Sequence, residues 1–301
     1  GDAGIVGMGG AGFPTKVKLS PKEPDKIEYI IANCAECEPY ITADYRRMLE
    51  YTEDLVSGMK VILSLFPNAR GVFAVEDNKK DCIEKLQKAV AGEPRIDVKA
   101  LMTKYPQGAE RQLIYAVTKR AINSTMLPAD AGCIVDNVET LIGIHNAVIK
   151  GKPLMERVVT VSGDAVEKPG NFMAPFGINH RELVEAAGGL KAEPQKLISG
   201  GPMMGFIGSG SQPVTKTTNA VLVLPQDHYL VKRKRSKSSI DMKRAAACCC
   251  QCSMCTDLCP RHLLGHPIQP HLFMRAATCK DVQPVSYTHL RAHETLRHLV
   301  C

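Results

Sequence analysis

The sequence predicts an α/β protein with a mainly parallel sheet, followed by a small α+β module and a cysteine-rich segment. Short apolar strands alternate with helical repeats over residues 1–150, which is typical of βαβ units. Residues 151–225 alternate differently and are rich in glycine and proline, and seven of the twelve cysteines lie between Cys248 and Cys279. We therefore expect domains at residues 1–150, 151–225 and 246–283, with a basic linker at residues 226–245.

Within the first domain, apolar runs and helical spacing predict four strands and four helices. The strands are Tyr29–Ala32, Gly71–Val75, Asp97–Met102 and Cys133–Val135, and the helices are Asp44–Leu65, Lys80–Val90, Gly108–Thr118 and Val138–Val148. The second domain is the size of a β-grasp module. Its sequence pattern predicts strands at Arg157–Ser162, Lys196–Ser199 and Val214–Leu224 and a helix at His180–Ala187. A glycine- and proline-rich connection lies at Gly163–Gly177.

Composition excludes several classes of protein. The 301 residues, 45% hydrophobic and 23% charged, are ordinary for globular domains. A membrane-spanning helix needs roughly eighteen consecutive apolar residues, and the sequence has no such run. The chain opens at Gly1 without a secretion signal, so we expect a start inside a longer protein and a reduced environment. Cysteines in such a chain favour a metal site over disulfides.

The net charge of +7 is localised. Seven Lys or Arg residues and one Asp give Lys232–Arg244 a balance of +6. Aromatic residues do not interleave with this run, and no nucleic-acid motif accompanies it, so we interpret it as a solvated hinge rather than a nucleic-acid site. A second interpretation is that it attracts an acidic partner protein or anionic lipid.

The last residues have an unusual origin in our interpretation. Pro284–Thr295 reads PVSYTHLRAHET, which resembles the translation of an adapter used in transposase-based DNA sequencing. We therefore exclude residues 284–301 from the fold prediction and expect the native sequence to continue differently beyond Gln283. The alternative is a real basic tail whose three histidines, His289, His293 and His298, suggest a metal site.

The cysteine cluster carries the most specific motif. Its spacing, C-x-x-C-x-x-C-x-x-x-C-P, is that of bacterial ferredoxins and uses Cys249, Cys252, Cys255 and Cys259. In that motif the first three thiolates hold one 4Fe–4S cluster and the fourth serves a second cluster. Zinc is the alternative, but zinc ribbons use two separated C-x-x-C pairs. A second run is absent from the sequence, so the ligand set of each cluster is incomplete.

A glycine-rich loop near the start predicts an anion site. Gly7-x-Gly9-x-x-Gly12 fits a dinucleotide-binding fingerprint, in which backbone N–H groups approach a phosphate closely. On its own, the loop is equally well explained as a tight turn.

Four segments in order resemble the NADH-binding subunit of respiratory complex I. They are Gly9–Thr15 followed by Lys18, Asn33–Pro39, Gly108–Glu110 and Asp136–Leu141. Over Gly1–Val282 the chain is further similar to the C subunit of the Rnf electron-transport complex and to the related cobalamin reductase of propanediol-utilising microcompartments. The shared signatures are GGAGFPT, ECEPYITAD, EDNK, TKYPQGAERQL, GDAVEKPGNF and GGPMMG.

This resemblance implies a Rossmann-like complex I flavin domain, a β-grasp module of the SLBB type and a truncated ferredoxin-like segment. It also implies noncovalent FMN and NADH. The glycines would hold the FMN phosphate, Lys18 would add positive charge, and three polar residues would bind the phosphate or the ring edge. These residues are Gly7, Gly9, Gly10 and Gly12 for the phosphate, and Asn33, Asn137 and Thr140 for the polar contacts.

Three acidic residues, Glu36, Glu38 and Glu110, fit a site that binds ribose hydroxyls and orients nicotinamide; we assign Glu38 and Glu110 to catalysis. Structural alternatives exist for several of these groups. Lys18 and Glu38 are then solvated charges, and Asn137 and Thr140 cap a helix. The C-x-x-C pair of Cys34 and Cys37 lies inside a flavin-type segment, so we expect it to serve packing.

The implied function is an electron relay from NADH through FMN to 4Fe–4S clusters, or the reverse. FMN is needed because NADH delivers two electrons together and clusters accept one at a time. The redox partner would be a ferredoxin-type protein, other Rnf subunits or a corrinoid protein. The chain would be cytoplasmic, peripheral to the cell membrane or associated with a microcompartment. Corrinoid reduction is the alternative activity, and a non-catalytic docking subunit is the alternative from another class.

Overall fold

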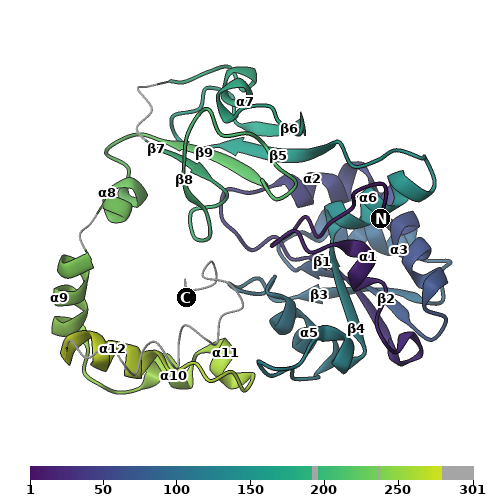
Figure 1. Ribbon diagram of the computed structural model, residues 1–301, viewed down its shortest axis with the longest axis horizontal. Coiled ribbons are helices and arrows are strands. Elements are labelled where there is room, and N and C mark those ends of the chain that lie inside the picture. Colours follow the sequence, from purple (N-terminus) through teal and green to yellow (C-terminus); the bar gives the residue numbers. More distant parts are fainter. Residues whose placement is uncertain (192–195, 236–237, 280–301) are drawn as a thin grey trace. The chain divides into compact units, whose positions relative to one another are not determined.

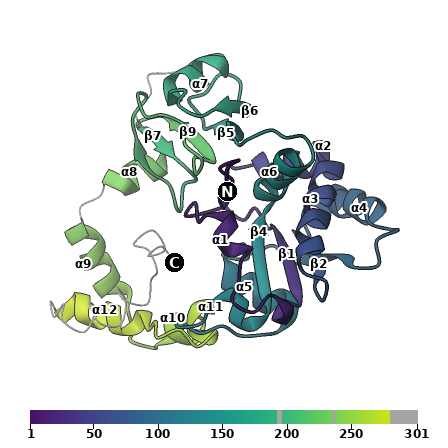
Figure 2. The ribbon, with the colours of Figure 1, turned by 45° about the vertical axis from the view of Figure 1, so that its right-hand side comes forward.

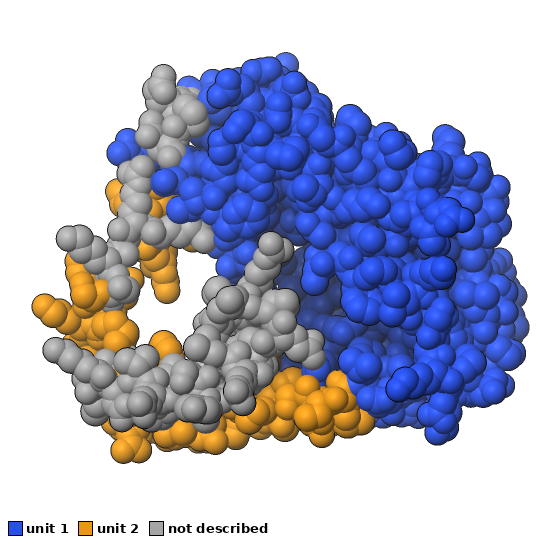
Figure 3. Space-filling model, in the orientation of Figure 1, with its two compact units in different colours: residues 1–120, 127–226 blue, residues 121–126, 227–301 orange. Residues whose placement is uncertain are grey.

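The computed structural model describes residues 1–191, 196–235 and 238–279, and it divides into two compact units, coloured in Figure 3. Unit 1 comprises residues 1–120 and 127–226, and unit 2 comprises residues 121–126 and 227–301. Unit 1 contains two sheets with their helices. Unit 2 is helical in its described part (Figure 1).

The first sheet is parallel throughout, in the strand order β3-β2-β1-β4. Its strands are β1 (Tyr29–Cys34), β2 (Arg70–Glu76), β3 (Ile96–Leu101) and β4 (Cys133–Asn137). In β1 and β2 nearly every residue is buried, as expected for strands covered on both faces. The prediction of a mainly parallel sheet is confirmed, and its four strands coincide with the four predicted ones.

Helices cover both faces of this sheet. Four of them share one apolar core with the strands: α2 (Ala43–Glu50), α3 (Thr52–Leu65), α4 (Lys80–Ala89) and α6 (Val138–Val148). The helix α5 (Glu110–Thr118) contributes nothing to that core, and Figure 2 shows the strands between α5 and α3. Two short helices at the start, α1 (Thr15–Lys18) and η1 (Pro24–Lys26), precede β1, and η2 (Pro128–Ala131) precedes β4.

The second sheet is mixed, in the order β6-β5-β9-β7-β8. Its strands are β5 (Glu156–Ser162), β6 (Gly170–Pro175), β7 (Lys196–Ser199), β8 (Phe206–Gly208) and β9 (Ala220–Leu224). The two central strands β5 and β9 are parallel, and the other pairs are antiparallel. The helix α7 (His180–Ala186) packs Leu183 and Val184 into the core of this sheet. This is the small α+β module that the sequence predicts.

One predicted helix is wrong, because the structure divides it into two helices. The helix expected at Asp44–Leu65 is divided into α2 and α3 at Tyr51, whose φ of −123° and ψ of 37° are not helical. The Arg47 guanidinium lies over the Tyr51 ring, 3.9 Å from its centre, and the Thr52 hydroxyl donates to Met48 O. Buried positions 48, 52, 55 and 59 continue at helical spacing across the break, so periodicity alone does not reveal it.

Two strands were missed, and both lie at the edges of the second sheet. The strand β6 falls in the glycine- and proline-rich connection, and β8 follows the GGPMMG segment. Their side chains are mostly exposed or half-buried, so they lack the apolar alternation that marks a core strand. The last strand is also shorter than predicted, since residues 214–219 lie outside β9.

In unit 2 the segment predicted as a basic linker is largely helical, with α8 (Tyr229–Arg235) and α9 (Ser238–Cys248). Lys and Arg are good helix formers, so a solvated basic run need not be extended. The cysteine motif follows with α10 (Met254–Asp257), α11 (Pro260–Leu263) and α12 (Pro270–Cys279). Among the described residues, no helix combines the length and apolar character needed to cross a membrane. The adapter-like residues 284–301 lie outside the described residues.

Candidate functional site

The topology of the first sheet sets the place of the candidate site. Parallel strands bring their carboxyl ends to one edge of the sheet. In the order β3-β2-β1-β4 the strand order reverses between β1 and β4, and such switch points are where these folds bind ligands. Asn33 near the end of β1 pairs in register with Asn137 at the end of β4. The predicted polar residues of both segments therefore meet at this edge.

The glycine loop is closed at its base and anchored to α6. Gly7 N donates to Phe13 O at 2.8 Å, and an antiparallel bridge joins Val6 to Pro14. Met8 N donates to the Thr140 hydroxyl at 3.0 Å, and Met8 is 1% exposed. Thr140 thus holds the loop through the backbone of Met8, and its predicted contact with a cofactor stays a prediction.

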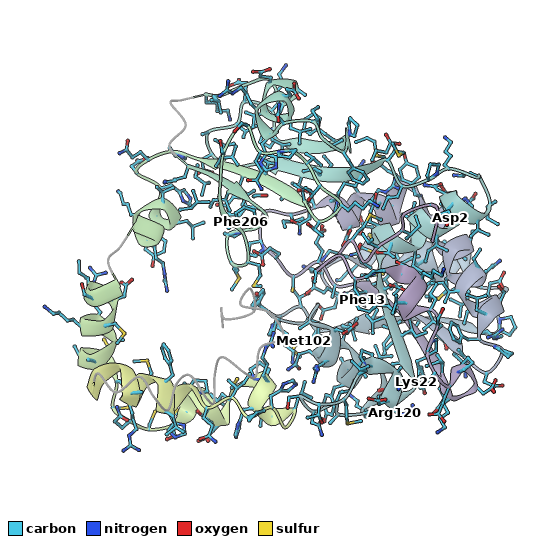
Figure 4. All side chains as sticks on the ribbon, viewed as in Figure 1. Asp2, Phe13, Lys22, Met102, Arg120 and Phe206 are labelled. Atoms are coloured by element: carbon cyan, nitrogen blue, oxygen red, sulfur yellow. The ribbon has the colours of Figure 1, made fainter. Side chains whose placement is uncertain are left out.

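The outer face of the loop has the chemistry of an anion site. The backbone N–H groups of Gly9, Gly10, Ala11 and Gly12 have no hydrogen-bond partner in the described part of the chain. A Cβ on Gly10 would meet no described heavy atom within 4 Å, whereas a Cβ on Gly9 would meet Asn137 at 2.9 Å. Gly12 has a φ of +72°, which favours glycine. Unpaired N–H groups on such a loop fit a phosphate. Phe13, labelled in Figure 4, follows them and is about half exposed.

Asn137 is fully engaged by the protein. Its side-chain oxygen accepts from Glu139 N at 2.9 Å and caps α6, while its Nδ2 donates to Asp44 Oδ2 at 2.6 Å. Asn33 is similar, since its Nδ2 donates to Gly108 O at 2.8 Å and its oxygen accepts from Ala35 N. Both side chains shape the loops around the edge of the sheet, and their predicted contact with a cofactor stays a prediction.

Lys18 lies among acidic groups rather than alone. Its ammonium donates to Val135 O at 2.7 Å and lies 3.5 Å from Asp136 Oδ1 and 3.7 Å from Glu110 Oε1. Asp136 is 2% exposed, and neither carboxylate oxygen has a hydrogen-bond partner in the described structure. Burial raises the pKa of Asp136 to about 6, against the opposing charge of Lys18. The Lys18 charge, which we predicted to act on the phosphate, is therefore already paired with the carboxylates of Asp136 and Glu110.

Glu36 and Asp44 form a second buried acidic pair. The Glu36 carboxylate accepts from Asp44 N at 2.9 Å and from Tyr45 N at 3.1 Å, at the start of α2. Burial, followed by the nearby Asp44 charge, raises the pKa of Glu36 to about 8. Burial also raises the pKa of Asp44 to about 6, although the hydrogen bond from Asn137 opposes this shift. Near neutral pH this pair can hold a proton.

Glu38 reaches across to the β-grasp module. Its Oε1 accepts from the backbone N–H groups of Met203 at 2.8 Å and Met204 at 3.0 Å. These residues belong to the GGPMMG segment, where a Cβ on Gly201 would overlap the Glu38 carboxylate. Glu38 is thus not a free solvated charge, because its carboxylate is hydrogen-bonded to the β-grasp module. Its predicted role in nucleotide binding stays a prediction.

A pocket of about 410 Å³ opens beside these acids. It is lined by Glu36–Thr42 after β1, by Glu76, Asn78 and Lys79 after β2, by Thr103–Tyr105 after β3, and by Tyr45. The Glu76–Lys79 ion pair in its wall is buried, with Nζ and Oε2 2.8 Å apart. The glycine loop does not line this pocket, so the loop and the pocket occupy different parts of the same edge.

In unit 2 the four predicted cysteine ligands differ in exposure. Cys252 and Cys255 are exposed, Cys249 is half-buried, and Cys259 is buried at 5% exposure. Hydrogen bonds from Met254 N–H and the Cys250 thiol lower the pKa of the Cys252 thiol, which favours the thiolate that binds metal. The donor set therefore fits an iron–sulfur cluster. In the described chain these thiols do not form a group already arranged around a metal.

Several residues at the site were missed by sequence reasoning. Arg157 comes from a predicted strand with no motif of its own, and Asp44, Met203 and Met204 were noticed only as parts of the shared signatures ECEPYITAD and GGPMMG. Asp136 was quoted without a role. For Arg157 and Asp136 a signal was available, because each is a charged residue beside the apolar residues of a predicted strand.

Three family models match successive parts of the chain. A family model described as the Nuo51 FMN-binding domain matches residues 1–146, an SLBB domain model matches residues 158–207, and a 4Fe-4S dicluster domain model matches residues 248–295. The last match extends beyond the described residues. The sheets described above, together with these matches, confirm the predicted fold class.

Curated relatives resemble the chain over most of its length. The C subunit of the proton-translocating ferredoxin:NAD(+) oxidoreductase complex of Clostridium ljungdahlii is 43% identical over 263 residues, which cover 87% of this chain and 55% of the relative. The C subunit of the Na(+)-translocating complex of Acetobacterium woodii is 41% identical, with coverages of 87% and 57%. Cobalamin reductase PduS of Salmonella typhimurium is 39% identical, with coverages of 91% and 59%. The chain spans little more than half the length of these relatives.

Among solved structures, the fold resembles an NAD+-reducing NiFe-hydrogenase. In its air-oxidised state the match has a TM-score of 0.64 at 21% identity and covers 82% of this chain and 47% of the other. In the H2-reduced state the TM-score is 0.65 at 18% identity, with coverages of 98% and 62%. At this identity the likeness shows the fold alone.

Proposed function

This chain belongs to the family that contains the C subunits of Rnf-type ferredoxin:NAD(+) oxidoreductase complexes and the PduS cobalamin reductases, and we propose that it transfers electrons between NADH, FMN and 4Fe–4S clusters. The observation that carries this proposal is the glycine loop, whose unpaired N–H groups lie at the switch point of a parallel sheet. The same residues lie within the match to an FMN-binding domain. The rest of the proposal depends on this assignment.

FMN fits the residues at this edge. The N–H groups of Gly9–Gly12 would bind its phosphate, and the open space above Gly10 leaves room for close approach. Within the described chain the buried Asp136 carboxylate is paired with Lys18, at 3.5 Å, and has no well-formed hydrogen bond. Lys18 balances that charge and can donate in turn.

A bound FMN would supply the ability to take two electrons together, as a hydride, and to release them one at a time. The chain's own residues would supply binding, orientation and proton storage. Glu36 holds a proton near neutral pH because its pKa is raised to about 8. Glu110, which starts α5 and pairs with Lys18, would orient the nicotinamide donor. NADH as that donor is part of the proposal.

The cysteine segment would receive or deliver single electrons. Cys249, Cys252 and Cys255 would hold one 4Fe–4S cluster, and Cys259 would contribute to a second. The basic segment before it would face an acidic redox partner, and the chain would work on the cytoplasmic face of a membrane complex. These placements follow the relatives named as parts of such complexes.

Corrinoid reduction is the second candidate, and it is favoured by the PduS relative, to which the chain is 39% identical over 275 residues. The two activities share the flavin and the clusters and differ in the electron acceptor. Supplying the NADH-reduced protein with ferredoxin or with a cob(III)alamin, and measuring which is reduced, separates them.

The flavin assignment is tested by Gly10→Leu, with Gly92→Leu as the matched control. Neither glycine has a positive φ, and an added Cβ meets no described heavy atom within 4 Å at either position. Gly92 lies after α4, away from the loop. We expect G10L to abolish FMN retention because its side chain occupies the space of the phosphate, and G92L to retain FMN. Equal FMN content in folded G10L protein would overturn the assignment.

A further inference from the structure

A buried arginine of the β-grasp module contacts the glycine loop directly. Arg157, in β5, is 2% exposed, and its Nη1 donates to Met8 O at 3.2 Å and to Lys216 O at 2.5 Å. Within the described residues no carboxylate lies within ion-pair distance of it. Burial lowers the pKa of Arg157, opposed by the more distant charges of Glu139 and Asp44. With the weaker bond from Nε to Val158 O at 3.4 Å, this buried cation donates to three backbone carbonyls, one of which belongs to the loop.

The Met8 peptide groups are therefore held from two domains. The Met8 N–H donates to Thr140 on α6, and the Met8 carbonyl accepts from Arg157 on β5. The residues whose N–H groups are unpaired, Gly9–Gly12, follow immediately. Because an arginine guanidinium has donors in a fixed planar arrangement, it fixes the direction of the carbonyl as well as its distance.

Two more contacts join the same parts. Lys216 Nζ donates to Gly4 O at 2.6 Å, before the loop, and the Thr217 methyl group lies 3.1 Å from the position of a Cβ on Gly12, at its far end. Lys216 thus supports the chain before the loop, and Thr217 lies close to its far end, where it leaves little room for a side chain on Gly12. A different contact between the modules, Asn171 with Thr42, involves none of these residues.

We propose that Arg157 is a positioning residue for the FMN phosphate, through which the β-grasp module holds the glycine loop in its anion-binding shape. This inference rests on the proposed flavin site and adds a role for the second module in it. The module would then be part of the cofactor site and not only a neighbour of it. Arg157 itself would not touch FMN, since it acts through the Met8 carbonyl.

The FMN phosphate allows a test that separates positioning of the loop by Arg157 from a general contribution of Arg157 to folding. Riboflavin lacks the phosphate that the loop would bind, so a displaced loop should weaken FMN binding and leave riboflavin binding unchanged. The dissociation constants of FMN and riboflavin are measured by flavin fluorescence on the apo-protein of the full chain. The folded fraction of each variant is determined by circular dichroism and used to correct the active concentration.

We expect Arg157→Met to weaken FMN binding by at least about tenfold, which corresponds to ~1.4 kcal/mol, with riboflavin binding changed by less than about twofold. Arg157→Lys keeps a cation that can reach one carbonyl and should recover part of the loss. Asn171→Ala, the matched control, removes an inter-module contact away from the loop and should leave the FMN-to-riboflavin ratio unchanged.

Arg157→Met removes a positive charge near Asp44 and Glu139, although Glu139 keeps its ion pair with Arg47, so Lys216→Met provides a second variant with a milder change. It should shift the same ratio in the same direction, by about threefold, which is at the low end of the net contribution of one hydrogen bond. An unchanged ratio in K216M and in whichever Arg157 variant folds would overturn the inference. If the unaltered chain binds FMN no better than riboflavin, the proposed phosphate site itself is wrong.

Discussion

The glycine loop of unit 1 and the cysteine segment of unit 2 are built in opposite ways. Around the loop, Asn137, Thr140 and Arg157 make hydrogen bonds that need no ligand, and the parallel sheet beneath has a continuous apolar core. In the cysteine segment Cys252 and Cys255 are exposed, and buried Cys259 packs with Ile268 in a two-residue apolar cluster. The fold arranges the flavin site in advance, whereas a metal would have to gather the thiols.

The largest effect that this comparison predicts is on iron. Replacing Cys255 with serine removes one of three thiolates on the same cluster, so we expect anaerobically reconstituted C255S to lose nearly all iron of that cluster and to retain FMN. Cys248, which lies outside the ligand spacing, supplies the control C248S. Equal iron loss in C248S, measured by iron analysis, would remove the basis for the assigned ligands.

The unaltered chain gives a related expectation. Two cubane clusters need about eight irons and eight cysteines in two runs, and the sequence has one run. We therefore expect reconstitution to yield fewer than eight irons per chain, while FMN reaches one per chain. A stable complement of eight irons would show that residues outside the motif complete both ligand sets.

The next effect concerns local stability. Without iron, we expect limited proteolysis to cut within residues 249–259 well before it cuts the parallel sheet, because few apolar contacts hold the cysteine motif. Iron reconstitution should slow that cleavage by about tenfold if the cluster contributes folding energy. Mass spectrometry of the fragments identifies the sites. First cleavage inside β1 or β2 would reverse the comparison.

A smaller effect is expected at Glu110. We predict that Glu110→Gln slows flavin reduction by NADH by about tenfold, the effect of removing one charge-assisted contact, while dithionite still reduces the flavin. Glu84→Gln on the exposed side of α4 is the control. The measurement is stopped-flow flavin absorbance. If E110Q loses FMN instead, Glu110 belongs to the flavin site and not to the NADH site.

The last predicted effect is the pH dependence of unit 1 stability. Burial raises the pKa of Glu36 to about 8, so the native state keeps a proton that the unfolded chain has already released. The free energy of unfolding should therefore fall as pH rises from 5 to 8, by up to ~1.4 kcal/mol per pH unit for one proton. Glu36→Gln should flatten this slope in denaturant titrations, and Glu84→Gln should not. An unchanged slope in E36Q would show that Glu36 is ionised in the native protein.

The sequence predicts the parallel sheet better than it predicts the contacts around the site, and the reason is physical. The parallel sheet was predictable because each buried strand is followed by a helix with a regular apolar face. The break at Tyr51 was not, since the buried positions stay in phase across it. The contacts that shape the site join residues far apart: Asn137 and Asp44 are separated by 93 positions, and Arg157 and Met8 by 149. Local patterns carry no information on such pairs.

The cysteine motif shows the converse. Its spacing predicts the ligands and the cluster type because three closely spaced thiolates must bind one metal cluster. The structure of the described residues adds little to this prediction, because a bound cluster would itself bring the thiols together. The roles of the four cysteines and of the flavin-site residues stay predictions until ligands are measured.

The central claim is that electrons pass from NADH through a flavin in unit 1 to a cluster in unit 2. The most direct test is an anaerobic NADH titration of the full chain loaded with FMN and iron, followed by flavin absorbance and by the electron paramagnetic resonance of the reduced cluster. We predict that NADH bleaches the flavin and produces the cluster signal, and that C255S stops at flavin reduction. A flavin that dithionite reduces and NADH does not would contradict the account.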